Sequence, residues 1–207
     1  MNRLYLVTDG PIARQAGHTL PYVVEEACRA GVRWVQLREK DLSTRDFLDV
    51  ATQLKRITQA YEARLIINDR VDIALAVDAD GVHVGQDDMP HALVRRLIGP
   101  NRIIGLSVNT LAELEAARDT DLDYFGVATI FPTGTKPDTS SLLGLAGLRV
   151  ICQRANRPTF AIGGINAATI RSIRETGATG AAVVSAICGH PSPYEATRAL
   201  IKLLDNG

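Results

Sequence analysis

The chain has 207 residues, of which 46% are hydrophobic and 22% are charged, proportions that are typical of a globular protein. Lysine plus arginine and aspartate plus glutamate balance at 23 each, so no basic field for nucleic-acid binding exists, and any anion must be held by a local cluster. No apolar run approaches the roughly 20 residues of a membrane span, and Cys28, Cys152 and Cys188 lack metal-binding or disulfide spacing. We therefore expect a cytoplasmic protein with buried thiols and with neither a membrane nor a nucleic-acid partner.

Strand-like and helix-like patterns alternate along the whole chain. Strands are predicted within residues 4–10, 33–40, 65–68, 81–85, 101–110, 123–131, 157–166 and 178–188. Helices are predicted within residues 21–31, 43–63, 71–77, 90–99, 111–120, 140–156, 167–177 and 193–206. The segment between the first strand and the first helix, with Pro11 and Gly17, has the composition of a loop.

This alternation indicates a parallel sheet with helical crossovers, which is an α/β fold. Eight strand-helix units predict a single (β/α)8 TIM barrel spanning residues 1–207, compact against the roughly 250 residues that are typical. An open, doubly wound sheet is the main alternative.

The second predicted strand carries an unusual row of polar residues. Side chains alternate between the two faces of a strand, so Gln36, Arg38 and Lys40 share one face with Trp34. A buried polar row costs several kcal/mol unless something pairs with it. The partner is therefore either a set of internal acids or a bound anion.

Two aspartates follow neighbouring strands, Asp69 after the third and Asp88 after the fourth. The carboxyl ends of parallel neighbouring strands meet at one edge, where two carboxylates suit Mg²⁺ bound together with substrate phosphates. The alternative is that each aspartate caps the helix that follows it, since aspartate is a preferred N-cap.

Further candidates for anion binding follow other strands. Gly163-Gly164 and Val184-Ser185 follow strands seven and eight, where TIM barrels often hold phosphate. Lys136 and its threonine neighbours follow strand six and add one cation and two hydroxyls, although a solvated turn has the same composition. His83 shares the parity of a pocket residue, but a core histidine is an equal alternative.

These residues predict two anion sites at the same end of the barrel, where the carboxyl ends of the strands lie. Arg38, Lys40, Asn68, Ser107 and Lys136 are placed to surround a polyphosphate bridged by a metal, and the backbone amides around the diglycine to hold a second phosphate. We therefore expect two phosphorylated substrates, with the cations and the metal stabilising a pyrophosphate leaving group.

Over nearly its whole length the chain resembles the thiamine-phosphate synthase family. The matching stretches, in this order, are YLVTDG, VQLREKD, LIINDRVDIALAVDADGVHVGQDD, IIGLSV, DYFGVATIFPTGTKPD, AIGGIN and VVSAI. The resemblance implies a Mg²⁺-dependent barrel enzyme that joins 4-amino-2-methyl-5-hydroxymethylpyrimidine diphosphate to 4-methyl-5-(2-hydroxyethyl)thiazole phosphate, giving thiamine phosphate and pyrophosphate. The mechanism that it implies is dissociative: pyrophosphate leaves first, and the thiazole nitrogen then attacks a pyrimidine methylene cation.

The same resemblance implies a role for each matching residue. The diphosphate ligands would be Arg38, Lys40, Asn68, Ser107 and Lys136, of which Arg38, Lys40, Ser107 and Lys136 would be catalytic. The metal ligands would be Asp69 and Asp88, and the pyrimidine contacts Gln36 and His83. The thiazole-phosphate site would comprise Thr133, Thr135, Gly164 and Ser185, and Val184 is a further candidate for substrate binding.

The chain departs from the family at two positions, with Asn109 where histidine is frequent and Thr129 where proline is frequent. Asn109 and the retained residues 133–136 favour the synthase over a related thiazole tautomerase, which depends on a histidine near residue 109. A sugar-phosphate isomerase or epimerase barrel and a non-catalytic ligand sensor are further alternatives. The sequence leaves a homo-oligomer open.

Overall fold

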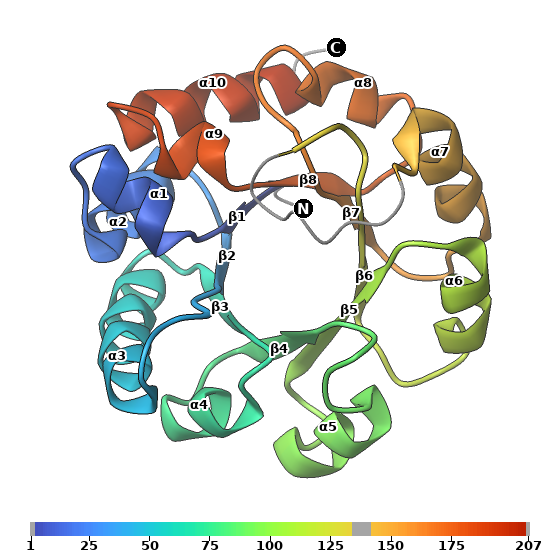
Figure 1. Ribbon diagram of the computed structural model, residues 1–207, viewed down its shortest axis with the longest axis horizontal. Coiled ribbons are helices and arrows are strands. Elements are labelled where there is room, and N and C mark those ends of the chain that lie inside the picture. The colour runs from blue at the N-terminus through green and yellow to red at the C-terminus, as the bar shows by residue number, and fades with distance from the viewer. Residues whose placement is uncertain (1–2, 134–141, 206–207) are drawn as a thin grey trace.

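The computed structural model of the protein describes residues 3–133 and 142–205. Eight parallel strands form a closed barrel in chain order, with β1 pairing with both β2 and β8, and helices surround it (Figure 1). The strands are β1 (Leu4–Val7), β2 (Trp34–Leu37), β3 (Arg64–Asn68), β4 (Gly81–Val84), β5 (Ile103–Val108), β6 (Tyr124–Val127), β7 (Thr159–Ala161) and β8 (Gly180–Val183). The predicted (β/α)8 TIM barrel is therefore confirmed.

Helices connect successive strands and cover the outside of the barrel (Figure 1). They are α1 (Gly10–Gln15), α2 (Leu20–Ala30), α3 (Thr44–Ala60), α4 (Val71–Ala76), α5 (His91–Ile98), α6 (Leu111–Ala117), α7 (Gly144–Arg154), α8 (Ile170–Arg174), α9 (Ser185–Cys188) and α10 (Pro193–Asp205). Within the described ranges, no helix combines the length and apolarity needed to cross a membrane.

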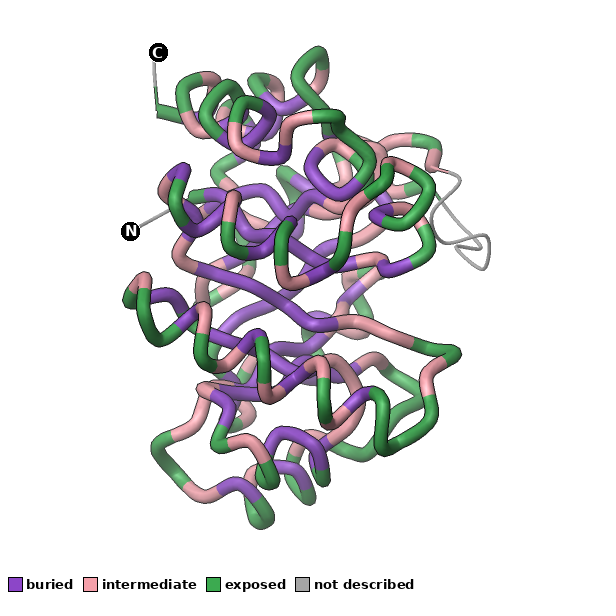
Figure 2. Tube along the Cα trace, turned by 90° about the vertical axis from the view of Figure 1, so that its left-hand side faces the viewer, coloured by how far each residue is buried: buried purple, intermediate pink, exposed green. Residues whose placement is uncertain are grey.

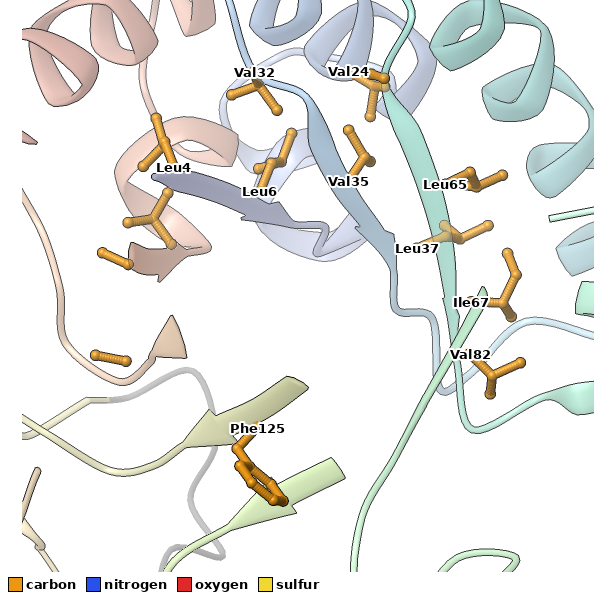
Figure 3. Packing of buried hydrophobic residues seen from close by; sticks show 14 of the residues in the cluster. Leu4, Leu6, Val24, Val32, Val35, Leu37, Leu65, Ile67, Val82 and Phe125 are labelled. Carbon is orange, nitrogen blue, oxygen red and sulfur yellow. The ribbon is translucent and has the colours of Figure 1, made fainter. Parts of the chain in front are cut away.

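Side-chain alternation along the strands produces two separate apolar clusters. The outer cluster joins strands to helices, and Figure 3 shows Leu65 and Ile67 pointing from β3 toward the surrounding helices. Cys28 and Cys188 belong to this cluster as free thiols, and burial raises the pKa of each to about 12. Buried residues accordingly follow the strands and the inner helical faces, whereas exposed residues lie on the outer turns (Figure 2).

The inner cluster fills the barrel itself with Tyr5, Trp34, Ile66, Tyr124 and Phe160, together with two smaller residues. The Trp34 ring lies 5.6 Å from the Tyr5 ring and 5.6 Å from the Tyr124 ring, measured between centroids. This aromatic packing closes the middle of the barrel and forms the floor beneath the carboxyl ends of the strands.

Two short helices were not predicted. Asp9 caps α1, its side chain accepting a hydrogen bond from the Ile12 amide at 3.0 Å, and Pro11 occupies the first turn. An N-cap aspartate followed by proline is a start signal for a helix, so the start of α1 could have been predicted from the sequence. α9 begins at Ser185, in a region that the apolar pattern assigned to the eighth strand.

Candidate active site

A cavity of about 960 Å³, counting its open mouth, lies at the carboxyl ends of the strands. Its floor includes Tyr5, Tyr124 and Phe160, and its wall combines polar and aliphatic residues. The predicted substrate-binding residues that line it are Gln36, Arg38, Asn68, His83, Ser107, Thr133, Gly164, Val184 and Ser185. The fold thus brings together residues from strands that are far apart in sequence.

Lys40, Asp69 and Asp88 form a charged cluster beside this cavity. Lys40 Nζ lies 3.8 Å from Asp69 Oδ2, and Asp88 Oδ2 accepts a hydrogen bond from the Gly85 amide at 2.7 Å. The pKa of Asp69 is raised to about 6, chiefly by burial and then by the hydrogen bond and charge of Asp88, against the opposing effects of Lys40 and Arg38. The two carboxylates are therefore adjacent, as a shared cation requires.

Neither aspartate acts as a helix cap. The N-cap position of α4 is Arg70 and that of α5 is Pro90, and neither makes a side-chain capping bond. Asp69 instead adopts a φ of 61°, a left-handed conformation that is uncommon for residues other than glycine. The capping alternative is thus not observed.

Two carboxylates match the ligand preference of Mg²⁺, which is usually held by one or two carboxylates plus substrate phosphates. Among residues 3–133 and 142–205, no group of three or more His, Cys, Asp or Glu side chains is placed to bind a metal. Asp69 and Asp88 could therefore hold a divalent cation between them.

The segment that carries Arg38 and Lys40 is anchored on both sides. The Arg38 amide donates to Thr8 Oγ1 at 3.0 Å, and the Gly10 amide donates to Glu39 Oε1 at 2.8 Å. Burial raises the pKa of Glu39, while the Gly10 hydrogen bond opposes this shift. These bonds hold residues 38 and 39, next to Lys40, against the loop after β1.

His83 lies on the inner face of β4, as its parity predicted, where it is buried and lines the cavity. Its Nε2 lies 2.8 Å from Ser107 Oγ, and its Nδ1 lies 2.9 Å from Tyr124 Oη. Tyr124 Oη lies in turn 2.9 Å from Tyr5 Oη, which accepts from Gln36 Nε2 at 3.1 Å. These hydrogen bonds link side chains of β1, β2, β4 and β6 to the predicted diphosphate contact at Ser107.

The turn after β7 requires its two glycines. Gly163 and Gly164 have φ values of 106° and 63°, and a Cβ on Gly164 would lie 2.6 Å from Pro132 O and 2.7 Å from Phe131 Cβ. The turn therefore packs directly on the segment after β6, leaving backbone amides close to the cavity.

Thr135 and Lys136 lie outside the described residues.

Of the two departures from the family pattern, Thr129 is buried in the cavity wall, and the peptide bond that precedes it is cis. The Asn109 side chain donates to Glu113 Oε2 at 3.2 Å. Its amide is thus engaged with the start of α6.

The aromatic floor of the site was not predicted from the sequence. Tyr5, Tyr124 and Phe160 alternate with aliphatic residues in short strands, and this pattern also occurs in an ordinary core. The alternation of side chains along each strand could have identified these residues. Tyr5 lies on the same face of its strand as the cavity residue Val7, and Tyr124 on the same face as the cavity residue Gly126.

A closed barrel with a cavity at the carboxyl ends of its strands, lined in part by polar and charged side chains, defines an enzyme of the TIM-barrel class. The model of the family described as "Thiamine monophosphate synthase" matches residues 4–187. The chain therefore belongs to the thiamine monophosphate synthase family.

Similar proteins agree with this assignment. The chain is 47% identical to a thiamine-phosphate synthase of Vibrio parahaemolyticus, over 98% of each sequence. It is 50% identical to one of Chloroflexus aurantiacus, over 98% of this chain and 92% of the relative. A thiamine phosphate pyrophosphorylase structure from Pyrococcus furiosus superposes with a TM-score of 0.88 at 38% identity, covering 99% of this chain and 96% of the other.

Proposed function

We propose that this barrel is a thiamine-phosphate synthase, a transferase of thiamine biosynthesis that joins the pyrimidine diphosphate and the thiazole phosphate named above and releases pyrophosphate. The family match and the full-length relatives support this activity. The observation that carries the chemical assignment is the charged cluster at the rim, where two adjacent carboxylates stand beside Lys40. A diphosphate would pair with Lys40, and the magnesium ion bound to it would pair with the two carboxylates.

In this proposal the rim holds the leaving group. Arg38, Lys40, Asn68 and Ser107, with Lys136 from outside the described residues, would bind the diphosphate. Asp69 and Asp88 would hold Mg²⁺, which neutralises charge on the departing pyrophosphate when bound. The protein's own donors add to this effect, since preorganised charges stabilise the charge that develops as the bond breaks.

The opposite side of the cavity would hold the thiazole phosphate. Gly164 and Ser185 line the cavity after β7 and β8, where barrels of this class commonly bind phosphate. Thr133 lines the same cavity, and Thr135 would complete the set. Gln36 and His83 lie deeper and would contact the pyrimidine ring, so that the reacting carbon lies between the two anion sites.

The test is pyrophosphate release by the purified protein given both substrates, first with Mg²⁺ and then with excess chelator. We expect release that requires both substrates and metal, with thiamine phosphate as co-product. Tight binding of either substrate without release would instead favour a tautomerase or a ligand sensor.

A matched pair of variants localises the activity. Lys40→Ala should lower kcat by about a hundredfold, because one donor to the developing charge is lost. Lys202→Ala removes an exposed lysine from α10 and should leave kcat unchanged. Equal activity of the two variants would contradict the assigned diphosphate site.

A further inference from the structure

One continuous hydrogen-bond chain runs through the interior of the barrel and ends at the cavity. Its members, in order, are Gln36, Tyr5, Tyr124, His83 and Ser107, joined by contacts of 3.1, 2.9, 2.9 and 2.8 Å. The chain includes two tyrosine hydroxyls that the proposed function does not use.

The orientation of the Gln36 amide, with its nitrogen toward Tyr5, sets the direction of the first two links. The amide nitrogen of Gln36 is a donor, so Tyr5 Oη accepts there and keeps one hydrogen to give. The described contacts of Tyr5 Oη are with Gln36 and Tyr124, and a buried hydroxyl hydrogen is normally bonded. The Tyr5 hydrogen therefore goes to Tyr124 Oη.

The direction of these bonds determines the state of His83. Because Tyr124 accepts from Tyr5, its own hydrogen is directed at His83 Nδ1, which must accept it. A neutral imidazole with an accepting Nδ1 carries its proton on Nε2, which then donates to Ser107 Oγ. The Ser107 hydroxyl hydrogen is left for a partner in the cavity.

The surrounding packing holds this geometry. The His83 and Tyr124 rings stack with centroids 5.5 Å apart, and Tyr5 meets Phe160 edge to face at 5.4 Å. Burial raises the pKa of both tyrosines, so their hydroxyls keep the hydrogens that the chain requires. A Cβ on Gly105 would lie 2.5 Å from His83 Nδ1, so a glycine is needed beside the relay.

We propose that Tyr5 and Tyr124 are positioning residues that hold His83 as its Nε2–H tautomer and thereby direct the Ser107 hydroxyl hydrogen into the cavity. The identity of the acceptor rests on the proposed function, in which it is an oxygen of the diphosphate. A donor fixed in this orientation before substrate binds needs no reorganisation as charge develops on the leaving group. The opposite direction, set by a Gln36 carbonyl facing Tyr5, would give the Nδ1–H tautomer.

The tautomer can be read directly by long-range ¹H–¹⁵N NMR on the intact, ligand-free enzyme labelled at histidine. His83→Gln assigns the His83 signals among the four histidines of the chain. We expect an unprotonated Nδ1 and a protonated Nε2 in the wild type, and loss of this preference in Tyr124→Phe. Nδ1–H in the wild type, or an unchanged spectrum in Tyr124→Phe, would overturn the proposal.

Two further variants serve as a control and as a substitute for Tyr124→Phe. Tyr22→Phe changes an exposed tyrosine on α2 and should leave the His83 signals in place. If Tyr124→Phe does not fold, Tyr5→Phe breaks the relay one link earlier and carries the same expectation.

Kinetics test whether the relay acts through Ser107. Tyr124→Phe should lower kcat by about tenfold and change KM for the pyrimidine diphosphate much less, because the affected bond strengthens in the transition state. In a Ser107→Ala background the same change should cost little more, whereas multiplying losses would refute action through Ser107. Absence of pyrophosphate release in the wild type would count against the proposed function alone, since the tautomer is read without substrate.

Discussion

Asp69 combines an uncommon backbone conformation with an uncommon charge environment. Its φ is 61°, and its carboxyl has a pKa of about 6 because of burial and the neighbouring Asp88. The backbone and side chain are therefore both held in an arrangement that costs free energy in the absence of a ligand. Costs of this kind are concentrated at functional sites.

This arrangement makes the stability of the ligand-free protein depend on pH. The folded-state pKa of Asp69 is raised above 3.8, so the stabilising proton is fully bound below about pH 4 and is lost as the pH rises through about 6. Urea unfolding in excess chelator should show Asp69→Asn equal to the wild type near pH 4 and about 2 kcal/mol more stable near pH 8.

Magnesium should change this comparison. At about pH 8 the cation should stabilise the wild type and leave Asp69→Asn unaffected, since the metal binds the ionised carboxylate. Asp49→Asn, an exposed change on α3, serves as the control and should follow the wild type throughout. A pH dependence that survives in Asp69→Asn would assign the effect to another group.

At this scale the sequence identifies charged residues better than aromatic ones. Arg38 and Asp69 stand out because charge is expensive to bury without a partner, so their presence at strand ends already suggests a ligand. Tyr5 and Tyr124 do not stand out, because tyrosine is common in cores. Their role depends on hydroxyl-to-hydroxyl distances across 119 residues of sequence, which no local pattern records.

Among the secondary-structure elements, the turn after β7 and the segment after β6 depend on each other. Gly164→Ala would place a Cβ 2.6 Å from Pro132 O and 2.7 Å from Phe131 Cβ, so both segments must shift. We expect KM for the thiazole phosphate to rise by about tenfold or more, because the proposed phosphate contacts move with the turn. Steady-state kinetics with saturating pyrimidine diphosphate measures this change.

Gly17→Ala is the matched control. Gly17 also has a positive φ, 81°, but a Cβ there would have no neighbour within 4 Å. It should cost about 1 kcal/mol of stability, as alanine does at a left-handed position, and leave KM unchanged. A similar rise in KM in both variants would attribute the effect to backbone strain in general.

The elements themselves were predictable where periodicity was long. α3 and α10 have 17 and 13 residues, enough turns for an amphipathic pattern to be recognised. α1 and α9, with six and four residues, are too short for a period to repeat. α1 was still recoverable from its cap, whereas α9 is apolar enough to be assigned to the preceding strand.

For the whole molecule, the count of strand-helix units was sufficient to predict closure, because seven right-handed crossovers between eight strands place the last strand beside the first. The count does not reveal the shape of the cavity. That shape depends on which inward positions are small, such as Gly126 and Ala182, and which carry large rings, such as Tyr124. Barrel closure thus follows from the order of strands and helices in the sequence, whereas the shape of the site follows from side-chain packing.

Closure itself is testable at Gly180, where β8 meets β1. A Cβ on this glycine would collide with Arg3 O and approach Phe160 Cε1 to 2.9 Å, so the first and last strands could not keep their spacing. We expect Gly180→Ala to lower the free energy of unfolding by about 1–3 kcal/mol, the usual cost of overpacking. Trp34, the single tryptophan, contacts the Phe160 ring, so its fluorescence should report the loss of stability together with the far-ultraviolet circular dichroism.

Gly177→Ala is the control for this prediction. Gly177 has a φ of 88°, and a Cβ there would have its nearest neighbour at 3.6 Å, so the change should cost only about 1 kcal/mol. Equal losses in the two variants would show that strand spacing at the β1–β8 junction tolerates the extra methyl group.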